Sequence, residues 1–157
     1  MNRPREFDLI CFDWDGTLFD STGIITRCIQ QAVVDVGGVR PTDEAASYVI
    51  GMALMPALAH AAPDVPKEKY PLLGERYRHH YLAHQNDISL FDGVLPMLAE
   101  LKARHHWLAV ATGKSRAGLN VALARSGRLR CAGAAPRGAQ RGRSGRLAAR
   151  ARLTLPR

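Results

Sequence analysis

Two mostly apolar runs of strand length lie far apart along the chain. Residues 7–12 read Phe-Asp-Leu-Ile-Cys-Phe, and residues 107–111 read Trp-Leu-Ala-Val-Ala. A polar sequence that contains glycine follows each run. Short apolar runs bounded by turns are typical of strands buried in a parallel sheet. We therefore expect one buried strand at each place.

Helical spacing dominates the residues between and after these runs. Apolar residues recur at intervals of three and four from Ile24 to Val36, and Gly37-Gly38 stops the pattern. Further helical segments are expected at 42–61, with a break near Gly51 or Pro56, and at 67–85, 94–101 and 118–124. This order of segments predicts an α/β core with a helical domain inserted after the first strand.

The composition is that of a soluble globular protein. Hydrophobic residues make up 46% and charged residues 23% of the 157 residues. No apolar run approaches the ~20 residues that cross a bilayer, and the N-terminus has no signal-peptide core. Three cysteines without CxxC spacing predict neither a disulfide framework nor a zinc site. We expect a cytoplasmic protein without membrane contact.

The net charge of +8 originates in the last fifth of the chain. Residues 127–157 contain nine arginines, no lysine and no acidic residue, whereas residues 1–126 hold 13 basic and 14 acidic residues. The segment consists mainly of Arg, Ala, Gly, Leu and Pro, so it can bury little apolar area, and its like charges repel one another. We expect residues 128–157 to be a disordered tail or, given the abrupt change in composition, a segment read out of frame.

Two aspartates, Asp13 and Asp15, directly follow the first predicted strand. Open α/β sheets bind ligands at the carboxyl ends of their strands. Two carboxylates so close repel one another unless a cation neutralises them, and hard oxygen ligands suit Mg²⁺. Gly16 allows a sharp turn close to an oxyanion, and Thr17 offers a hydroxyl donor. The pattern predicts a magnesium and phosphate site, although solvated aspartates in a turn would also explain an Asp-x-Asp pair alone.

The full sequence Asp13-Trp14-Asp15-Gly16-Thr17-Leu18 resembles the first motif of the haloacid dehalogenase-like phosphatases, and Phe19-Asp20-Ser21 continues the match to their phosphoglycolate phosphatase-like branch. The resemblance implies a Rossmann-like core and a helical cap that covers the active site and selects small phosphorylated substrates. It implies that Asp13 attacks phosphorus to form an aspartyl-phosphate, and that Asp15 protonates the leaving alcohol and then activates water. Both aspartates would bind Mg²⁺.

Thr112 and Gly113 directly follow the second predicted strand. A hydroxyl and backbone N–H groups near a helix start can bind phosphate, although an ordinary helix N-cap also explains these two residues. Their position matches the family's second motif, which implies that Thr112 binds the phosphoryl oxygens. Thr-Gly-Lys-Ser at 112–115 is similar to the end of a P-loop, but Leu108 stands where that motif requires glycine, so we reject a P-loop.

Two further motifs of the family have no counterpart in this sequence. No Asp or Glu follows Glu100 to complete the metal site, and Lys114 is the last lysine, so a third-motif lysine has no candidate. We therefore expect a Mg²⁺-dependent phosphatase whose activity is impaired. Alternatives are an inorganic pyrophosphatase or sugar-phosphate mutase of the same superfamily, and a non-catalytic module with a nucleic-acid-binding tail. The lack of aromatic residues between the tail arginines disfavours nucleic acid.

The segments and the resemblance together define the expected domains. Residues 1–18 and 88–127 form the N-terminal half of a haloacid dehalogenase-like α/β core, with an incomplete parallel sheet. Residues 19–87 form the inserted helical cap domain, and the Arg/Ala/Gly-rich tail follows at 128–157.

Overall fold

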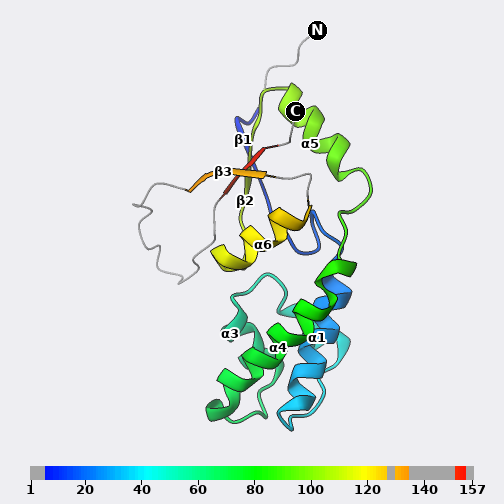
Figure 1. The fold of residues 1–157 in the computed structure, drawn as a ribbon, viewed down its shortest axis with the longest axis vertical. Coiled ribbons are helices and arrows are strands. Elements are labelled where there is room, and N and C mark those ends of the chain that lie inside the picture. Colours follow the sequence, from blue (N-terminus) through cyan, green and yellow to red (C-terminus); the bar gives the residue numbers. More distant parts are fainter. Residues whose placement is uncertain (1–5, 127–129, 135–150, 155–157) are drawn as a thin grey trace. The chain divides into compact units, whose positions relative to one another are not determined.

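The structure is a computed structural model that describes residues 6–126, 130–134 and 151–154. It contains two compact units, one formed by residues 1–18 and 90–157 and the other by residues 19–89 (Figure 1). We call them the α/β unit and the helical unit. The predicted insertion of residues 19–87 differs from the observed helical unit by two residues at its end.

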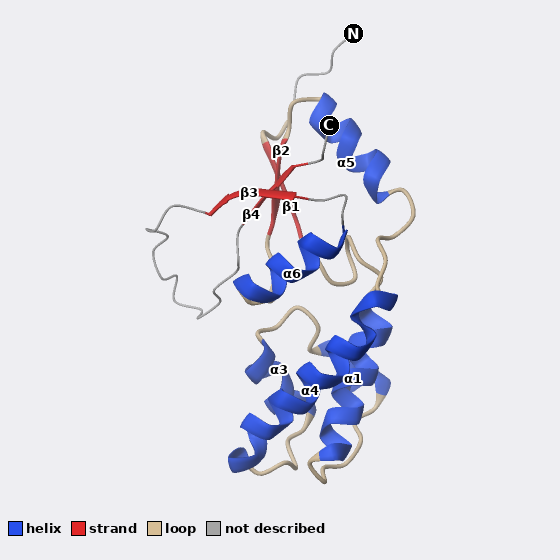
Figure 2. Cartoon of the chain, viewed as in Figure 1, coloured by secondary structure: helices blue, strands red, loops and turns tan. Residues whose placement is uncertain are grey.

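A parallel pair of strands forms the start of the α/β unit. Strands β1 (Leu9–Phe12) and β2 (Trp107–Val110) pair with Leu9 opposite Trp107 and Phe12 opposite Val110 (Figure 2). The ladder continues past β2, where the Ala111 N–H donates to the Phe12 carbonyl at 2.8 Å. This pair confirms the expected α/β core, with the helical segment inserted after its first strand.

The sheet continues with two strands from the arginine-rich segment. Strands β3 (Arg130–Ala134) and β4 (Ala151–Thr154) complete the order β1-β2-β4-β3, and β4 is antiparallel to both neighbours. The expected disorder of residues 128–157 therefore does not hold for these two segments, and the rest of that tail lies outside the described residues. Strand pairing uses backbone groups, so a sequence with few large apolar side chains can still add to a sheet edge.

The two parallel strands differ in burial. Leu108 and Val110 of β2 are buried, whereas Leu9 of β1 is 58% exposed and Cys11 is also exposed. The prediction of a fully buried first strand is therefore wrong. A parallel strand is buried on both faces only where helices cover both, and the described residues leave one face of β1 uncovered.

Two helices accompany the strands in the α/β unit. Helix α5 (Val94–Ala103) begins after Gly93, whose φ of +81° suits glycine, and contacts β2. Pro96 lies in its first turn, where proline is tolerated. Helix α6 (Arg116–Ser126) follows β2 and contacts β3. Each helix buries apolar residues at helical spacing, namely Val94, Leu98, Leu119 and Leu123.

The helical unit consists of four α-helices and two short 3₁₀ turns. They are α1 (Thr22–Asp35), α2 (Asp43–Tyr48), α3 (Leu54–Ala61), η1 (Lys67–Lys69), α4 (Tyr70–His84) and η2 (Gln85–Asp87). The break predicted inside residues 42–61 occurs around Gly51, whose φ is +92°, while Pro56 fits the first turn of α3. At the start of α2, the Thr42 hydroxyl accepts a hydrogen bond from the Ala45 N–H at 3.2 Å.

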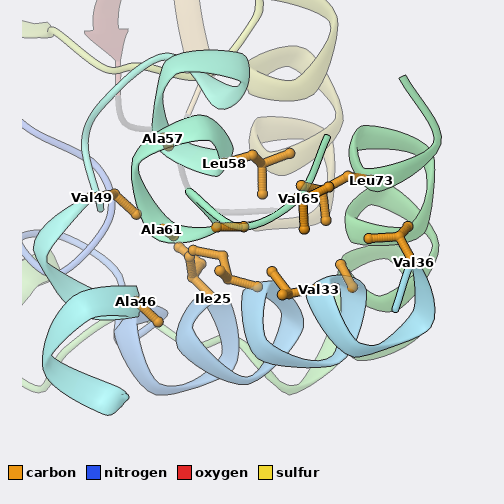
Figure 3. Close-up of a cluster of buried hydrophobic side chains, with 13 residues drawn as sticks. Ile25, Val33, Val36, Ala46, Val49, Ala57, Leu58, Ala61, Val65 and Leu73 are labelled. Atoms are coloured by element: carbon orange, nitrogen blue, oxygen red, sulfur yellow. The ribbon is translucent and has the colours of Figure 1, made fainter. Parts of the chain in front are cut away.

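Small and branched aliphatic side chains form the core of the helical unit. Figure 3 shows Ile25 and Val33 of α1, and Val36 directly after it, pointing toward Leu58 of α3 and Leu73 of α4. Leu58, Leu73 and Val33 are fully buried. The predicted apolar face of the first helix is therefore the face that packs against the other helices.

Candidate active site

The register of β1 and β2 places two predicted motifs at one end of the sheet. Because Phe12 lies opposite Val110 in parallel strands, Asp13 and the residues from Ala111 onward leave the sheet side by side. Thr112 is buried and Asp13 is half-buried at this edge. Residues 99 positions apart in sequence are thus brought to the carboxyl ends of neighbouring strands, where open α/β sheets bind ligands.

Asp13 lies in an environment that disfavours its charge. Burial is the main cause that raises the pKa of this carboxyl above its ordinary value, and the nearby Asp15 carboxylate raises it further. A hydrogen bond from the Trp14 backbone N–H and the positive charge of Lys114 oppose this shift. The two aspartates are therefore close enough to repel one another, as the sequence predicts.

Lys114 provides positive charge at this pair of carboxylates. Its Nζ lies 3.0 Å from Oδ2 of Asp15, and the side chains are only 14% and 11% exposed. An ion pair with so little solvent contact is less screened than a surface pair. The sequence analysis rejected Lys114 as part of a P-loop and gave it no role at the site. The available signal was its place directly after Thr112-Gly113, in the turn that follows the strand paired with β1.

Thr112 does not cap helix α6 but stabilises the turn that precedes it. Its hydroxyl oxygen accepts a hydrogen bond from the Lys114 N–H at 3.2 Å. Ser115 performs the capping instead, since its hydroxyl oxygen accepts from the Gly118 N–H at 3.1 Å in the first turn of α6. The helix-cap interpretation of Thr112 is therefore wrong, and its side chain fixes the turn that carries Gly113 and Lys114.

The first motif forms a tight turn after β1. Gly16 adopts a φ of +75°, and the Leu18 N–H donates to the Trp14 carbonyl at 3.1 Å. Trp14 and Leu18 are buried and anchor the turn, whereas Gly16 and Thr17 are exposed. The structure thus brings Asp13, Asp15 and Thr112 together with Lys114, and Thr17 is exposed in the turn that follows Asp15.

The carboxylate pair fits only a loosely held magnesium ion. Mg²⁺ commonly takes one or two protein carboxylates and completes its shell with water and substrate phosphate, and Asp13 and Asp15 offer such oxygens. No set of three His, Cys, Asp or Glu side chains that could hold a metal occurs in the part of the chain that the structure describes. Asp13 and Asp15 are therefore the residues that would bind the ion.

Two known relatives match most of the chain but only part of their own length. Tyrosine-protein kinase PtkA of Mycobacterium tuberculosis is 31% identical over 115 residues, which are 68% of this chain and 36% of the kinase. Phosphoglycolate phosphatase of Aliivibrio fischeri is 31% identical over 118 residues, which are 70% of this chain and 52% of the phosphatase. The chain thus spans about a third to half of these relatives.

A solved structure has a fold similar to that of this chain. The putative haloacid dehalogenase-like hydrolase from Bacteroides fragilis superposes with a TM-score of 0.67 at 22% identity, covering 76% of this chain and 57% of that protein. Within the described residues, no helix has both the length and the apolar character needed to cross a membrane.

The profile of the haloacid dehalogenase-like hydrolase family matches residues 10–129, which include both strand-end motifs and the helical unit. The chain belongs to the haloacid dehalogenase-like hydrolases.

Proposed function

We propose that this chain is a cytoplasmic, Mg²⁺-dependent phosphatase of the phosphoglycolate phosphatase type, which acts on small phosphomonoesters. The observation that carries the proposal is the pair Asp13 and Asp15, with Lys114, at the carboxyl ends of two parallel strands. Family membership and the similarity to a phosphoglycolate phosphatase support the reaction class. The free thiols of Cys11 and Cys28 suit a reducing compartment.

The first half of the proposed reaction transfers the phosphoryl group to the protein. A carboxylate oxygen of Asp13 forms a bond to phosphorus while the bond between phosphorus and the ester oxygen breaks. Asp15 donates a proton to the departing alkoxide, so the alcohol leaves neutral. Thr112, Gly113 and Thr17 would bind the phosphoryl oxygens through hydroxyl and backbone N–H groups.

The second half releases the phosphate. Asp15, now ionised, accepts a proton from water as the water oxygen attacks phosphorus. The bond between phosphorus and Asp13 breaks, which regenerates the carboxylate and frees orthophosphate. Mg²⁺ bound at Asp13 and Asp15 would supply positive charge that offsets the repulsion between the carboxylates and the phosphate.

Low turnover is part of the proposal. No Asp or Glu follows Glu100 in this sequence, so no further carboxylate from that part of the chain can hold the metal. Removing one preorganised charged stabiliser commonly costs about 3–4 kcal/mol of transition-state stabilisation, or roughly a hundredfold to a thousandfold in rate. Because hydrolysis is expected to be slow, the assay must detect the covalent aspartyl-phosphate as well as the released phosphate.

The test compares the wild-type chain with Asp13→Asn and with Asp92→Asn, a matched change at an exposed aspartate of the α/β unit. Hydrolysis of p-nitrophenyl phosphate and of 2-phosphoglycolate is followed with Mg²⁺, and labelled protein is tested for release of phosphate by hydroxylamine, which cleaves acyl phosphates. We expect wild type and Asp92→Asn to show both signals. Asp13→Asn should show neither, because it lacks the attacking oxygen.

Two outcomes would count against the phosphatase proposal. Equal hydrolysis by wild type and Asp13→Asn would mean that the measured activity does not use this carboxylate. Salt-sensitive DNA binding without turnover would favour the alternative of a basic binding module instead.

Phosphoryl transfer to protein tyrosine is a second candidate function, favoured by the 31% identity to the relative named as a tyrosine-protein kinase. Incubation with γ-labelled ATP and a tyrosine-containing polymer separates the two functions. Labelled phosphotyrosine that requires Asp13 would support a kinase, whereas release of orthophosphate alone supports the phosphatase.

A further inference from the structure

Strand β1 forms one edge of the sheet. The order β1-β2-β4-β3 gives β1 a neighbour on one side only among the residues that the structure describes. Hydrogen bonds from β2 and the residue after it reach the carbonyls of Asp8 and Phe12. Alternate residues of a parallel strand bond to the same neighbour, so Leu9 and Cys11 direct their backbone N–H and carbonyl groups away from β2.

The side chains at this edge are apolar and exposed. Phe7 is 64%, Leu9 58% and Trp107 54% exposed, and Cys11 is exposed as well. Leu9 lies opposite Trp107 in the register, so these two side chains share a face of the sheet. Residues 7–12 contain no Lys, Arg or Pro. Edge strands of natural proteins commonly carry such residues, which prevent pairing with another strand.

We propose that the edge of β1 is an interface between two copies of this chain, which pair antiparallel with Leu9 of one copy opposite Cys11 of the other. In this register the outward N–H and carbonyl groups of Leu9 and Cys11 all gain partners, and Ile10 lies opposite its own equivalent. Each Asp8 lies opposite Phe12, so the two carboxylates stay apart. The inference goes beyond the proposed phosphatase and requires neither substrate nor metal.

Charge favours the β1 edge over the other edge of the sheet. Strand β3 belongs to residues 127–157, which contain nine arginines and no acidic residue. Pairing two β3 edges would bring the like charges of two such segments together. In the order β1-β2-β4-β3, pairing at β1 keeps both arginine-rich strands of each copy away from the new contact. Because both copies use the same edge, the assembly closes as a dimer.

The first experiment measures the mass of the full chain by sedimentation over a wide range of protein concentration. A reducing agent is present, so that a disulfide between Cys11 thiols cannot hold the copies together. Leu9→Lys places a charge at the proposed interface, and Val121→Lys places one at an exposed apolar position of α6. We expect dimers of wild type and Val121→Lys with similar dissociation constants. Leu9→Lys should raise the constant at least about tenfold, because each dimer then holds two added like charges at the paired edge.

Three results would overturn the proposal. The first is a wild-type chain that stays monomeric at every concentration, and the second is a dimer that Leu9→Lys does not weaken. The third is particles that grow beyond two copies, because they would indicate head-to-tail pairing of different edges. None of these measurements depends on catalysis, so a lack of phosphatase activity would count against the proposed function alone.

A second experiment uses only the wild-type chain, in case Leu9→Lys does not fold. Hydrogen exchange of backbone amides is measured at concentrations below and above the dissociation constant. We expect the amides of Leu9 and Cys11 to exchange at least about tenfold more slowly in the dimer, because each gains a hydrogen-bond acceptor. Amides of the helical unit should exchange equally in both samples. A dimer in which Leu9 and Cys11 are not protected would place the interface elsewhere and contradict the proposal.

Discussion

Asp13 and Asp15 have the same side chain but different surroundings. Asp13 is a half-buried carboxyl whose pKa is raised chiefly by burial, whereas Asp15 pairs directly with Lys114. Burial leaves a carboxylate poorly solvated, which favours its attack on an electrophile, and an ion pair holds its partner in a defined position. The structure therefore places a poorly solvated carboxyl at Asp13 and holds the Asp15 side chain in a defined position beside it.

Cys28 permits a prediction about reactivity, because burial raises the pKa of its thiol to about 11 while the adjacent Arg27 charge lowers it in part. Thiolate is the reactive form, so at about pH 8 this thiol should react with iodoacetamide roughly a hundredfold more slowly than an ordinary one. The exposed Cys11 is the internal control. Peptide mass spectrometry should find Cys11 alkylated in the folded chain and Cys28 alkylated only in denaturant.

The same thiol gives a prediction for stability against pH. Its folded pKa of about 11 lies above the ordinary 9.0, so its contribution to stability is fully present below pH 9.0 and is lost as the pH rises to about 11. The difference in unfolding free energy between wild type and Cys28→Ala should therefore shrink by about 1 kcal/mol or more between about pH 8 and about pH 10. A difference that is constant over this interval would show that burial does not act on the thiol.

The candidate site was predictable from sequence where residues are neighbours in a motif. Asp13, Asp15 and Thr112 follow apolar strands, and this local signal sufficed to select them. The pairing of Lys114 with Asp15 was not predictable, because it depends on the register between β1 and β2 and on the turn held by the Thr112 hydroxyl. Spacing along one chain does not specify a contact across two strands.

Between elements, Gln30 provides the clearest polar connection in the helical unit. This residue of α1 is 3% exposed, and its amide donates to the Pro41 carbonyl at 3.0 Å and to Asp43 Oδ1 at 2.7 Å. Its carbonyl oxygen accepts from Arg40 at 2.9 Å. One side chain thus ties helix α1 to the loop and first turn that begin α2.

Loss of this connection should be measurable. We expect Gln30→Ala to lower the unfolding free energy by about 1–3 kcal/mol, since partners in a partly buried network lose their hydrogen bonds. Gln31→Ala is the matched control, because Gln31 is exposed on the same helix, and it should change stability by no more than about 0.5 kcal/mol. Urea denaturation of both variants gives the comparison, and equal stabilities would rule out a structural role for the network.

Among the secondary-structure elements, the helices were easier to predict from the sequence than the strands. Apolar spacing of three and four located α1 and α5 because one face of each helix is buried. The exposure of β1 and the existence of β3 and β4 depend on which distant segments complete the sheet. Strand pairing through backbone groups leaves little trace in side-chain pattern, so β3 and β4 could not be recognised in an arginine-rich sequence.

For the whole molecule, the helical unit has the properties of an independent insertion. At its ends the Asp20 N–H donates to the Ser89 carbonyl at 2.9 Å, and just outside them the Phe91 N–H donates to the Leu18 carbonyl at 3.1 Å. The chain therefore enters and leaves the unit at one point. The unit also has a hydrophobic core of its own, formed by residues of α1 to α4 and of the segments that directly follow α1, α2 and α3.

We accordingly expect residues 19–89 to fold as an isolated fragment, with a helical circular dichroism spectrum and cooperative urea unfolding. Chains of this length can fold alone when their core is continuous. Within the fragment, Leu58→Ala should lower the unfolding free energy by about 2–5 kcal/mol because Leu58 is fully buried. Leu72→Ala, at a position 42% exposed, should change it by only about 0.5 kcal/mol. Helical signal with non-cooperative unfolding, insensitive to Leu58→Ala, would mean that this core needs the α/β unit to pack, and the unit would then not be an independent insertion.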